Sequence, residues 1–139
     1  MDGVHPPGLV IFDCDGVLVD SEPISLAVTL DVLAEAGCPL DAEAGYAHLL
    51  GRSLGSMAAW LRNEQGLDLT EQHIAALRDR IFSRFRRELS AVDGVADMLA
   101  TLPVRHCVAS SSQPDRIRLS LEVTGLWPHF APNVFSASM

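Results

Sequence analysis

Two aspartates, two residues apart, are the side chains of this sequence best suited to chemistry. Asp13 and Asp15 open the string DCDGVLVDSE at 13–22, directly after the apolar run GLVIF at 8–12. One carboxylate can attack phosphorus and form an aspartyl phosphate, while a second can protonate the leaving oxygen and later activate water. Gly16 lets the backbone turn sharply, so that nearby N–H groups can face an anion. A bare pair of aspartates is more often a solvated turn, but this whole string after an apolar strand favours phosphoryl transfer.

Short strands joined by helices would have to position these aspartates. The run at 8–12 shows no alternation, which is typical of a strand buried on both faces of a parallel sheet. Two more strands are predicted at 104–110 and 133–137, with helices at 94–102 and between Pro114 and Gly125. The sequence therefore predicts an α/β fold with a doubly wound parallel sheet, where ligands bind beyond the carboxyl ends of the strands.

A block of about seventy residues between the first strand and the next core helix reads as helices throughout, and it is too long for a crossover. It predicts an inserted all-helical cap domain at 21–88, with the core formed by 1–20 and 89–139. Five residues are expected to be N-caps, and three glycines are expected to end helices. The expected N-caps are Ser21, Asp41, Ser53, Thr70 and Asp93, and the glycines are Gly37, Gly51 and Gly66.

The string DCDGVLVDSE resembles the first motif of haloacid dehalogenase superfamily hydrolases. It is most similar to the β-phosphoglucomutase and sugar-phosphatase branch, which carries a helical cap, and the resemblance runs from about residue 8 onward. It implies that Asp13 is the nucleophile and a Mg2+ ligand. It implies that Asp15 is the general acid and base, with its backbone carbonyl also on the metal. The backbone N–H groups of Cys14 and Asp15 would bind phosphate oxygens, while the Cys14 thiol has no assigned role.

The second family motif resembles VASSS at 108–112. By position, the Ser110 hydroxyl would donate to the transferring phosphoryl group with the Ser111 N–H beside it, whereas Ser112 fits helix capping before Pro114. In the helical block, LGRS at 50–53 resembles the family's substrate-specificity loop. Arg52 there could bind a substrate anion or could equally lie on the surface.

The chain departs from the family pattern in its later motifs. The family's third motif is a lysine and its fourth an acidic pair completing the Mg2+ site, both after the third strand, yet this sequence contains no lysine and ends near that strand. No arginine is expected to substitute, since Arg105 begins the second strand and Arg116 lies within the following helix. We therefore expect a core truncated at its C-terminus, with 8–12 as an open edge, in a longer enzyme. The alternative is a short protein that uses a partner or a swapped element.

Charge, apolar runs and cysteine content restrict the classes of partner and the compartment that we expect for this chain. A formal net charge of -8 disfavours nucleic acid, and no apolar run is long enough to cross a membrane or resembles a signal peptide. The three separated cysteines, Cys14, Cys38 and Cys107, indicate free thiols in the cytoplasm. The partner we expect is a small phosphorylated metabolite, and the full-length enzyme is expected to be a monomer.

The resemblance thus predicts a Mg2+-dependent phosphatase of a sugar or polyol phosphate that works through an aspartyl phosphate. One alternative is a hexose phosphomutase, although the mutase's cap arginine falls at Leu54 here. The other is a catalytically silent domain that binds phosphate or a protein partner.

Overall fold

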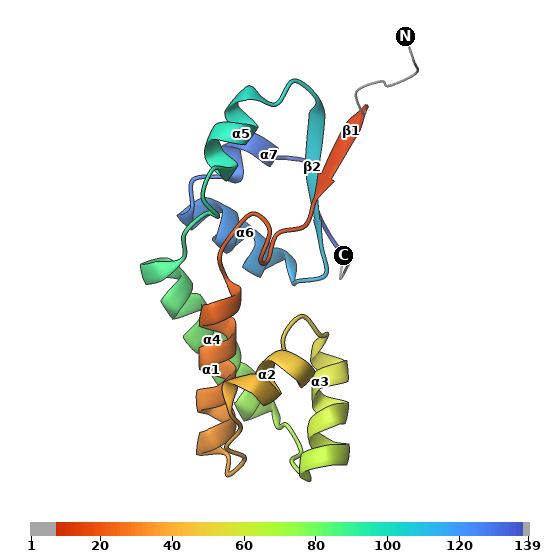
Figure 1. Ribbon diagram of the computed structural model, residues 1–139, viewed down its shortest axis with the longest axis vertical. Coiled ribbons are helices and arrows are strands. Elements are labelled where there is room, and N and C mark those ends of the chain that lie inside the picture. Colours follow the sequence, from red (N-terminus) through yellow and green to blue (C-terminus); the bar gives the residue numbers. More distant parts are fainter. Residues whose placement is uncertain (1–7, 138–139) are drawn as a thin grey trace. The chain divides into compact units, whose positions relative to one another are not determined.

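The computed structural model describes residues 8–137, which fall into two compact units (Figure 1). The core unit takes in the segments Met1–Asp20 and Leu89–Met139, of which 8–20 and 89–137 are described. The helical unit is Ser21–Glu88. The chain thus leaves the core once, builds a separate helical body, and returns.

The core unit contains a three-stranded parallel sheet in the order β1 (Leu9–Phe12), β2 (Arg105–Ser110) and β3 (Val134–Ser136). Phe12 pairs with Val108, which pairs in turn with Val134. All three strands therefore end at the same edge of the sheet, and the residues that follow β1 and β2 meet there. This confirms the α/β class and the parallel sheet predicted from the sequence.

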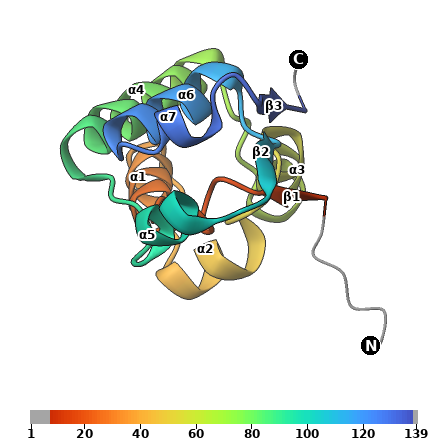
Figure 2. The ribbon, with the colours of Figure 1, turned by 90° about the horizontal axis from the view of Figure 1, so that it is seen from above.

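Three helices of the core unit, α5 (Val95–Thr101), α6 (Pro114–Val123) and α7 (Trp127–Phe130), lie on one side of the strands (Figure 2). Parallel crossovers are right-handed, so two steps in the same direction, β1 to β2 to β3, place the intervening helices on the same face. The opposite face stays open in the described residues, with Leu9 50%, Ile11 62% and Phe135 52% exposed. The expectation that β1 is buried on both faces is therefore wrong.

The short helix α7 was not expected from the sequence. It is joined to the sheet through His106, whose Nδ1 lies 2.9 Å from the Val104 carbonyl oxygen and whose Nε2 lies 2.9 Å from that of His129. The rings of Phe12, His106 and Phe130 pack edge to face around this link. This aromatic cluster fixes the helical layer against the buried face of β1 and β2.

The helical unit consists of α1 (Glu22–Glu35), α2 (Ala42–His48), α3 (Leu54–Trp60), the π-helical turn η1 (Leu61–Gln65) and α4 (Glu71–Glu88). Helices α1 and α4 form its main packed pair, with Val28, Leu33 and Phe85 among the buried side chains. At Gly45 in α2, a Cβ atom would meet Leu26 Cδ1 at 2.5 Å, so the glycine permits close packing of α2 on α1.

Three of the five expected N-caps are confirmed. Asp41 accepts a hydrogen bond from Ala44 N–H at 2.8 Å, and Ser53 and Thr70 accept from the backbone three residues on, at 3.1 and 3.2 Å. The expected stops Gly37, Gly51 and Gly66 all have positive φ.

The other two expected N-caps are wrong. Ser21 precedes α1 and makes no side-chain capping bond, because its backbone is already helical whereas an N-cap residue is normally extended. Asp93 lies one residue too early, since α5 is preceded by Gly94 at φ 85°, which brings no side-chain cap.

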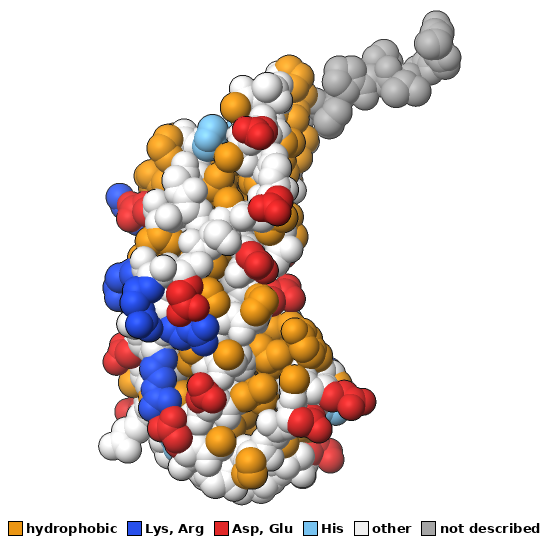
Figure 3. Space-filling model, turned by 60° about the vertical axis from the view of Figure 1, so that its left-hand side comes forward, with side chains coloured by type: hydrophobic (Ala, Val, Ile, Leu, Met, Phe, Trp, Pro, Cys, Tyr) orange, Lys and Arg blue, Asp and Glu red, His pale blue; other side chains and the backbone are white. Residues whose placement is uncertain are grey.

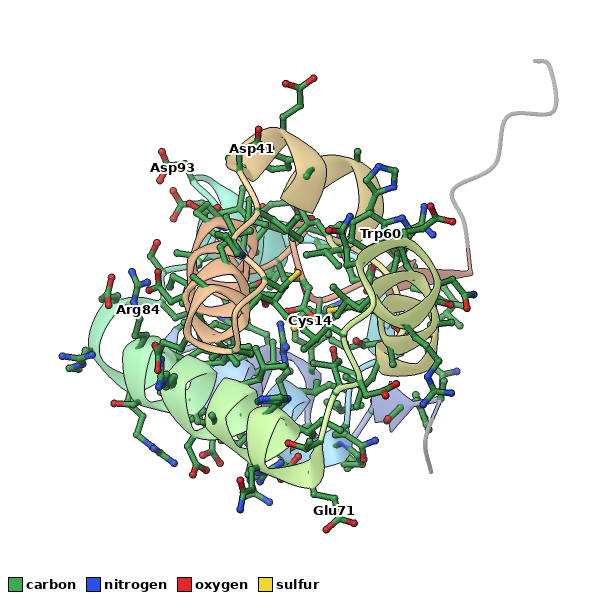
Figure 4. The ribbon with its side chains drawn as sticks, turned by 90° about the horizontal axis from the view of Figure 1, so that it is seen from below. Cys14, Asp41, Trp60, Glu71, Arg84 and Asp93 are labelled. Carbon is green, nitrogen blue, oxygen red and sulfur yellow. The ribbon has the colours of Figure 1, made fainter. Side chains whose placement is uncertain are left out.

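Two of the five arginines of α4 pair with acidic neighbours, as is typical of a solvated helix face. Arg80 binds Glu35, and Arg84 binds Glu88 one turn along the helix. Figure 3 shows such basic and acidic side chains interspersed on one face, and in Figure 4 Glu71 and Arg84 project outward from α4. Among residues 8–137, no helix has the length and apolar character needed to span a membrane.

Candidate active site

The loop that follows β1 is a compact turn built on one carbonyl. Cys14 O accepts hydrogen bonds from Leu18 N–H at 2.9 Å and Val19 N–H at 3.2 Å, and Gly16 N–H returns one to Val19 O at 2.9 Å. Gly16 sits at φ 74°, a conformation that L side chains rarely adopt, so the glycine is required there. The turn fixes where Asp13 and Asp15 leave the strand.

The C-terminal end of this turn is hydrogen-bonded to the segment by which the chain re-enters the core unit after α4. Asp20 N–H donates to Ser90 O, and Val92 N–H donates to Leu18 O, both at 2.9 Å. Both aspartates therefore lie on a segment that is hydrogen-bonded at its two ends.

Asp13 projects from the carboxyl end of β1 and is solvent-exposed. Its Oδ1 accepts a hydrogen bond from Cys14 N–H at 2.8 Å. Oδ2 accepts none from the residues that the structure describes, so one oxygen can face an incoming phosphorus. Cys14 N–H, expected to bind phosphate, serves Asp13 here, so phosphate binding at that N–H would have to share or exchange this bond.

The Cys14 thiol is shielded from solvent, with 1% of the residue exposed. Burial, reinforced by the charge of Asp15, raises the pKa of this thiol from 9.0 to about 12. The side chain remains a neutral core group at physiological pH, in keeping with its having no assigned chemical role.

The turn after β2 is held from two sides. Ser112 N–H donates to Ser110 Oγ at 3.1 Å, and Ala137 N–H donates to Ser110 O at 2.9 Å. From the end of β3, Ser136 Oγ donates to Ser112 O. Ser110 is 7% exposed and, because its Oγ accepts from the backbone, its own O–H stays available as a donor.

The two sequence motifs meet at Asp15. Ser112 Oγ donates to Asp15 Oδ2 at 2.7 Å, and Arg116 Nη2 lies 3.3 Å from Asp15 Oδ1. The expected capping role of Ser112 is wrong, because Gln113 is the N-cap of α6 and the Ser112 hydroxyl reaches Asp15 instead.

That no arginine substitutes for the family's lysine stays a prediction, although Arg116 does reach the β1 loop, because the first turn of α6 faces that loop. A sequence signal for Arg116 existed. A cation in the first turn of a helix opposes the helix dipole and needs an acidic neighbour. Nothing in the sequence marks Ser136, whose role depends on the pairing of β3 with β2.

Arg52 belongs to the helical unit, where it lies exposed in the connection between α2 and α3. Gly51 at φ 75° and the Ser53 cap shape this connection, and the His48 and Trp60 rings stack with centroids 4.5 Å apart at the ends of the two helices. Trp60 is labelled in Figure 4. The anion-binding role of Arg52 stays a prediction.

The donors after β1 suit a hard cation. A carboxylate from Asp13 and a backbone carbonyl from Asp15 are oxygen ligands of the kind Mg2+ prefers, and Mg2+ commonly takes its other ligands from water and substrate phosphate. Within 8–137, no three His, Cys, Asp or Glu side chains are grouped so as to hold a metal by themselves. A metal here would depend on such further oxygens.

The chain is similar to a curated phosphatase and to several solved structures. It is 28% identical to a 6-phosphogluconate phosphatase of Escherichia coli K12 over 130 residues, covering 91% of this chain and 58% of that protein. A conserved haloacid dehalogenase-like protein of unknown function from Agrobacterium tumefaciens is 34% identical with a TM-score of 0.80, over 94% of this chain and 59% of that one. A haloacid dehalogenase family hydrolase from Deinococcus radiodurans, solved with bound phosphate and sodium, is 29% identical with a TM-score of 0.71, over 94% and 58%.

These relatives extend beyond the part they share with this chain, which spans a little under three-fifths of each. The model of the family described as haloacid dehalogenase-like hydrolase matches residues 10–137, almost the whole described region. That match includes the β1 loop, the helical unit and the turn after β2. The chain belongs to the haloacid dehalogenase-like hydrolase family.

Proposed function

We propose that this chain carries the nucleophile and acid–base groups of a phosphatase that acts on a small phosphorylated sugar or polyol. The observation that carries the proposal is the hydrogen bond from Ser112 Oγ to Asp15 Oδ2, which joins the turn after β2 to the aspartate loop after β1. It supports a site at the edge of the sheet where β1 and β2 end, with Asp13 as the proposed phosphoryl acceptor, Asp15 as the proposed proton carrier and the serines after β2 as hydroxyl donors. Membership of the haloacid dehalogenase-like hydrolase family supports a hydrolytic reaction at this site.

The chemistry divides into two displacements at phosphorus. Asp13 attacks phosphorus, the ester P–O bond breaks, and the leaving oxygen takes a proton from Asp15. Water then attacks the aspartyl phosphate while Asp15 takes its proton, and cleavage of the P–O bond to Asp13 releases inorganic phosphate. The Ser110 O–H and the backbone N–H of Ser111 donate to the phosphoryl oxygens, where negative charge is concentrated.

Mg2+ would be held by the Asp13 carboxylate and the Asp15 carbonyl, and when bound it supplies positive charge against the phosphoryl oxygens. The phosphate and sodium bound to the Deinococcus relative support an anion-plus-cation site in this family.

The substrate class follows from the E. coli relative, whose name describes a phosphatase of 6-phosphogluconate. We propose that the helical unit serves as the cap and that Arg52 contributes a cation for an anionic group of the substrate. The exposed position of Arg52 leaves its guanidinium accessible to such a group.

The test is to trap the covalent intermediate at a defined residue. Two forms would be compared, the chain as given and a chimera that adds the remaining C-terminal segment of the Agrobacterium relative. Each is incubated with 6-phosphogluconate, other sugar phosphates and Mg2+, then quenched with borohydride, which reduces an aspartyl phosphate to homoserine. Homoserine at position 13, with free phosphate released, supports the proposal.

Two results would contradict it. Homoserine at another aspartate would remove Asp13 from the nucleophile role. A phosphorylated isomer of the substrate in place of free phosphate would identify a mutase.

A further inference from the structure

Both carboxylate oxygens of Asp15 are held by residues far along the chain. Oδ2 accepts from Ser112 Oγ at 2.7 Å and Oδ1 faces Arg116 Nη2 at 3.3 Å, across separations of 97 and 101 residues. The side chains of Arg116 and Asp15 are 25% and 26% exposed. The contact is thus largely shielded from solvent, where an ion pair keeps more of its strength than at the surface.

The residues that hold Asp15 are themselves fixed by the backbone. Ser112 is bound through its N–H to Ser110 and through its carbonyl to Ser136. Arg116 lies in the first turn of α6. Its backbone N–H donates to Gln113 O at 3.1 Å and to Asp115 Oδ1 at 2.9 Å. The Asp15 side chain is therefore held in place by residues from the end of β2, the end of β3 and the start of α6.

We propose that Arg116, together with Ser112, is a positioning residue that fixes the orientation of the Asp15 carboxylate for proton transfer. This inference rests on the proposed phosphatase function. A proton carrier must stay within hydrogen-bond reach of the leaving oxygen, and a side chain already fixed in place does not have to be ordered during the reaction.

The two partners bind the carboxylate group differently. A guanidinium has donors and no acceptor, so Arg116 can only donate to Oδ1, whereas the Ser112 hydroxyl can either donate or accept at Oδ2.

The first experiment measures the orientation of Asp15 directly in the chain as it exists. Three-bond NMR couplings from Asp15 Cγ to its backbone nitrogen and carbonyl carbon report the rotamer about χ1. The unmodified protein should show one rotamer, and Arg116→Met, which keeps the aliphatic stem but no donors, should show loss of that single value through averaging. Arg118→Met is the matched control, because Arg118 lies on the same helix but pairs with Glu122. Averaging in the unmodified protein, or an unchanged coupling in Arg116→Met, would overturn the proposal.

The second experiment measures proton transfer through the leaving group. A poor leaving group such as an alkyl alcohol needs a proton, whereas p-nitrophenolate leaves without one. In the chimera, Arg116→Met should lower kcat/KM, which reports phosphoryl transfer to Asp13 and not the later hydrolysis, about 10- to 100-fold for an alkyl phosphate and less than about threefold for p-nitrophenyl phosphate. Asp15→Asn should show the same selectivity more strongly, Arg116→Lys should recover part of the loss, and Arg118→Met should match the unmodified protein.

Equal losses of kcat/KM with both substrates would show that Arg116 supports the fold and not protonation of the leaving group. If no form of the protein releases phosphate, the proposed function fails, whereas the coupling measurement still decides whether Arg116 holds Asp15.

Discussion

Asp13 and Asp15 are held in different ways, and the difference matches the different work proposed for each. Asp13 is exposed and bound through one oxygen to the next backbone N–H, which leaves its second oxygen open. Asp15 is bound through both oxygens to side chains from the turn after β2 and the start of α6. A nucleophile needs an accessible lone pair, while a proton carrier needs a fixed direction.

Replacing the proposed nucleophile tests its role most directly. We expect Asp13→Asn to reduce phosphate release to below about a hundredth of the unmodified rate, because an amide is a poor nucleophile and a weak metal ligand. Steady-state assays of the chimera with and without the substitution provide the measurement. A variant that keeps more than about a hundredth of the rate would show that positioning alone explains the catalysis.

Cys14 should make stability fall at alkaline pH. Its pKa is raised from 9.0 to about 12 by burial, so the neutral thiol stabilises the folded chain below pH 9 and this contribution is lost as the pH rises towards 12. By pH 10.5 the loss should reach about 2 kcal/mol. Denaturant unfolding between pH 8 and 10.5 should show a shallower decline in Cys14→Ala, and parallel curves would contradict the prediction.

The sequence identifies Asp13, Asp15 and Ser110 as site candidates because they lie within short motifs that follow strands. It does not identify Ser136, and the position of Arg116 in the first turn of a helix indicates an acidic neighbour without naming it, because both contacts depend on how α6 and β3 pack beside β2. Ser112 shows a further limit. A serine before a helix normally suggests a cap, and only the fold shows that its hydroxyl has an acidic partner.

Residue type and spacing predict most of the helices and strands, whereas capping depends on backbone geometry. Asp41 has an extended backbone and bonds to the first turn of α2, while Asp93 lies before Gly94 and caps nothing. The exposed face of β1 could not be predicted either. An apolar run predicts a strand but does not indicate which face of that strand the neighbouring helices cover.

Asp41 and Asp93 make a matched pair for testing whether backbone geometry decides capping. Asp41→Ala should lower the free energy of unfolding of the helical unit by about 1 kcal/mol, because it removes the hydrogen bond to Ala44 N–H. Asp93→Ala should change the stability by less than about 0.5 kcal/mol, as is usual for an exposed side chain without such a bond. Thermal and denaturant unfolding of both variants is the measurement. Equal losses of stability in the two variants would mean that residue type alone, and not backbone geometry, determines capping.

The chain as given should have no measurable phosphatase activity by itself. Its sequence has no lysine, the Arg116 guanidinium is engaged by Asp15, and among residues 8–137 no three His, Cys, Asp or Glu side chains are grouped so as to hold a metal. Loss of one electrostatic contact of this kind costs about 100- to 1000-fold in rate. Phosphate release from p-nitrophenyl phosphate with Mg2+ would be compared between the chain and the chimera. Comparable rates would mean that the chain completes its site in another way, most simply with residues of a second copy.

The insertion of the helical unit between β1 and β2 also sets an order of events during folding. Asp15 and Ser112 are 97 residues apart, so the hydrogen bond between them cannot form until most of the described chain has been synthesised. The contacts between α1 and α4 within the helical unit span shorter separations, such as the 45 residues between Glu35 and Arg80. Local contacts form faster than long-range strand pairing. Pulse-labelling hydrogen exchange during refolding should therefore find the amides of α1 and α4 protected before those of β1 and β2, so that the edge carrying the candidate site forms after the helical unit.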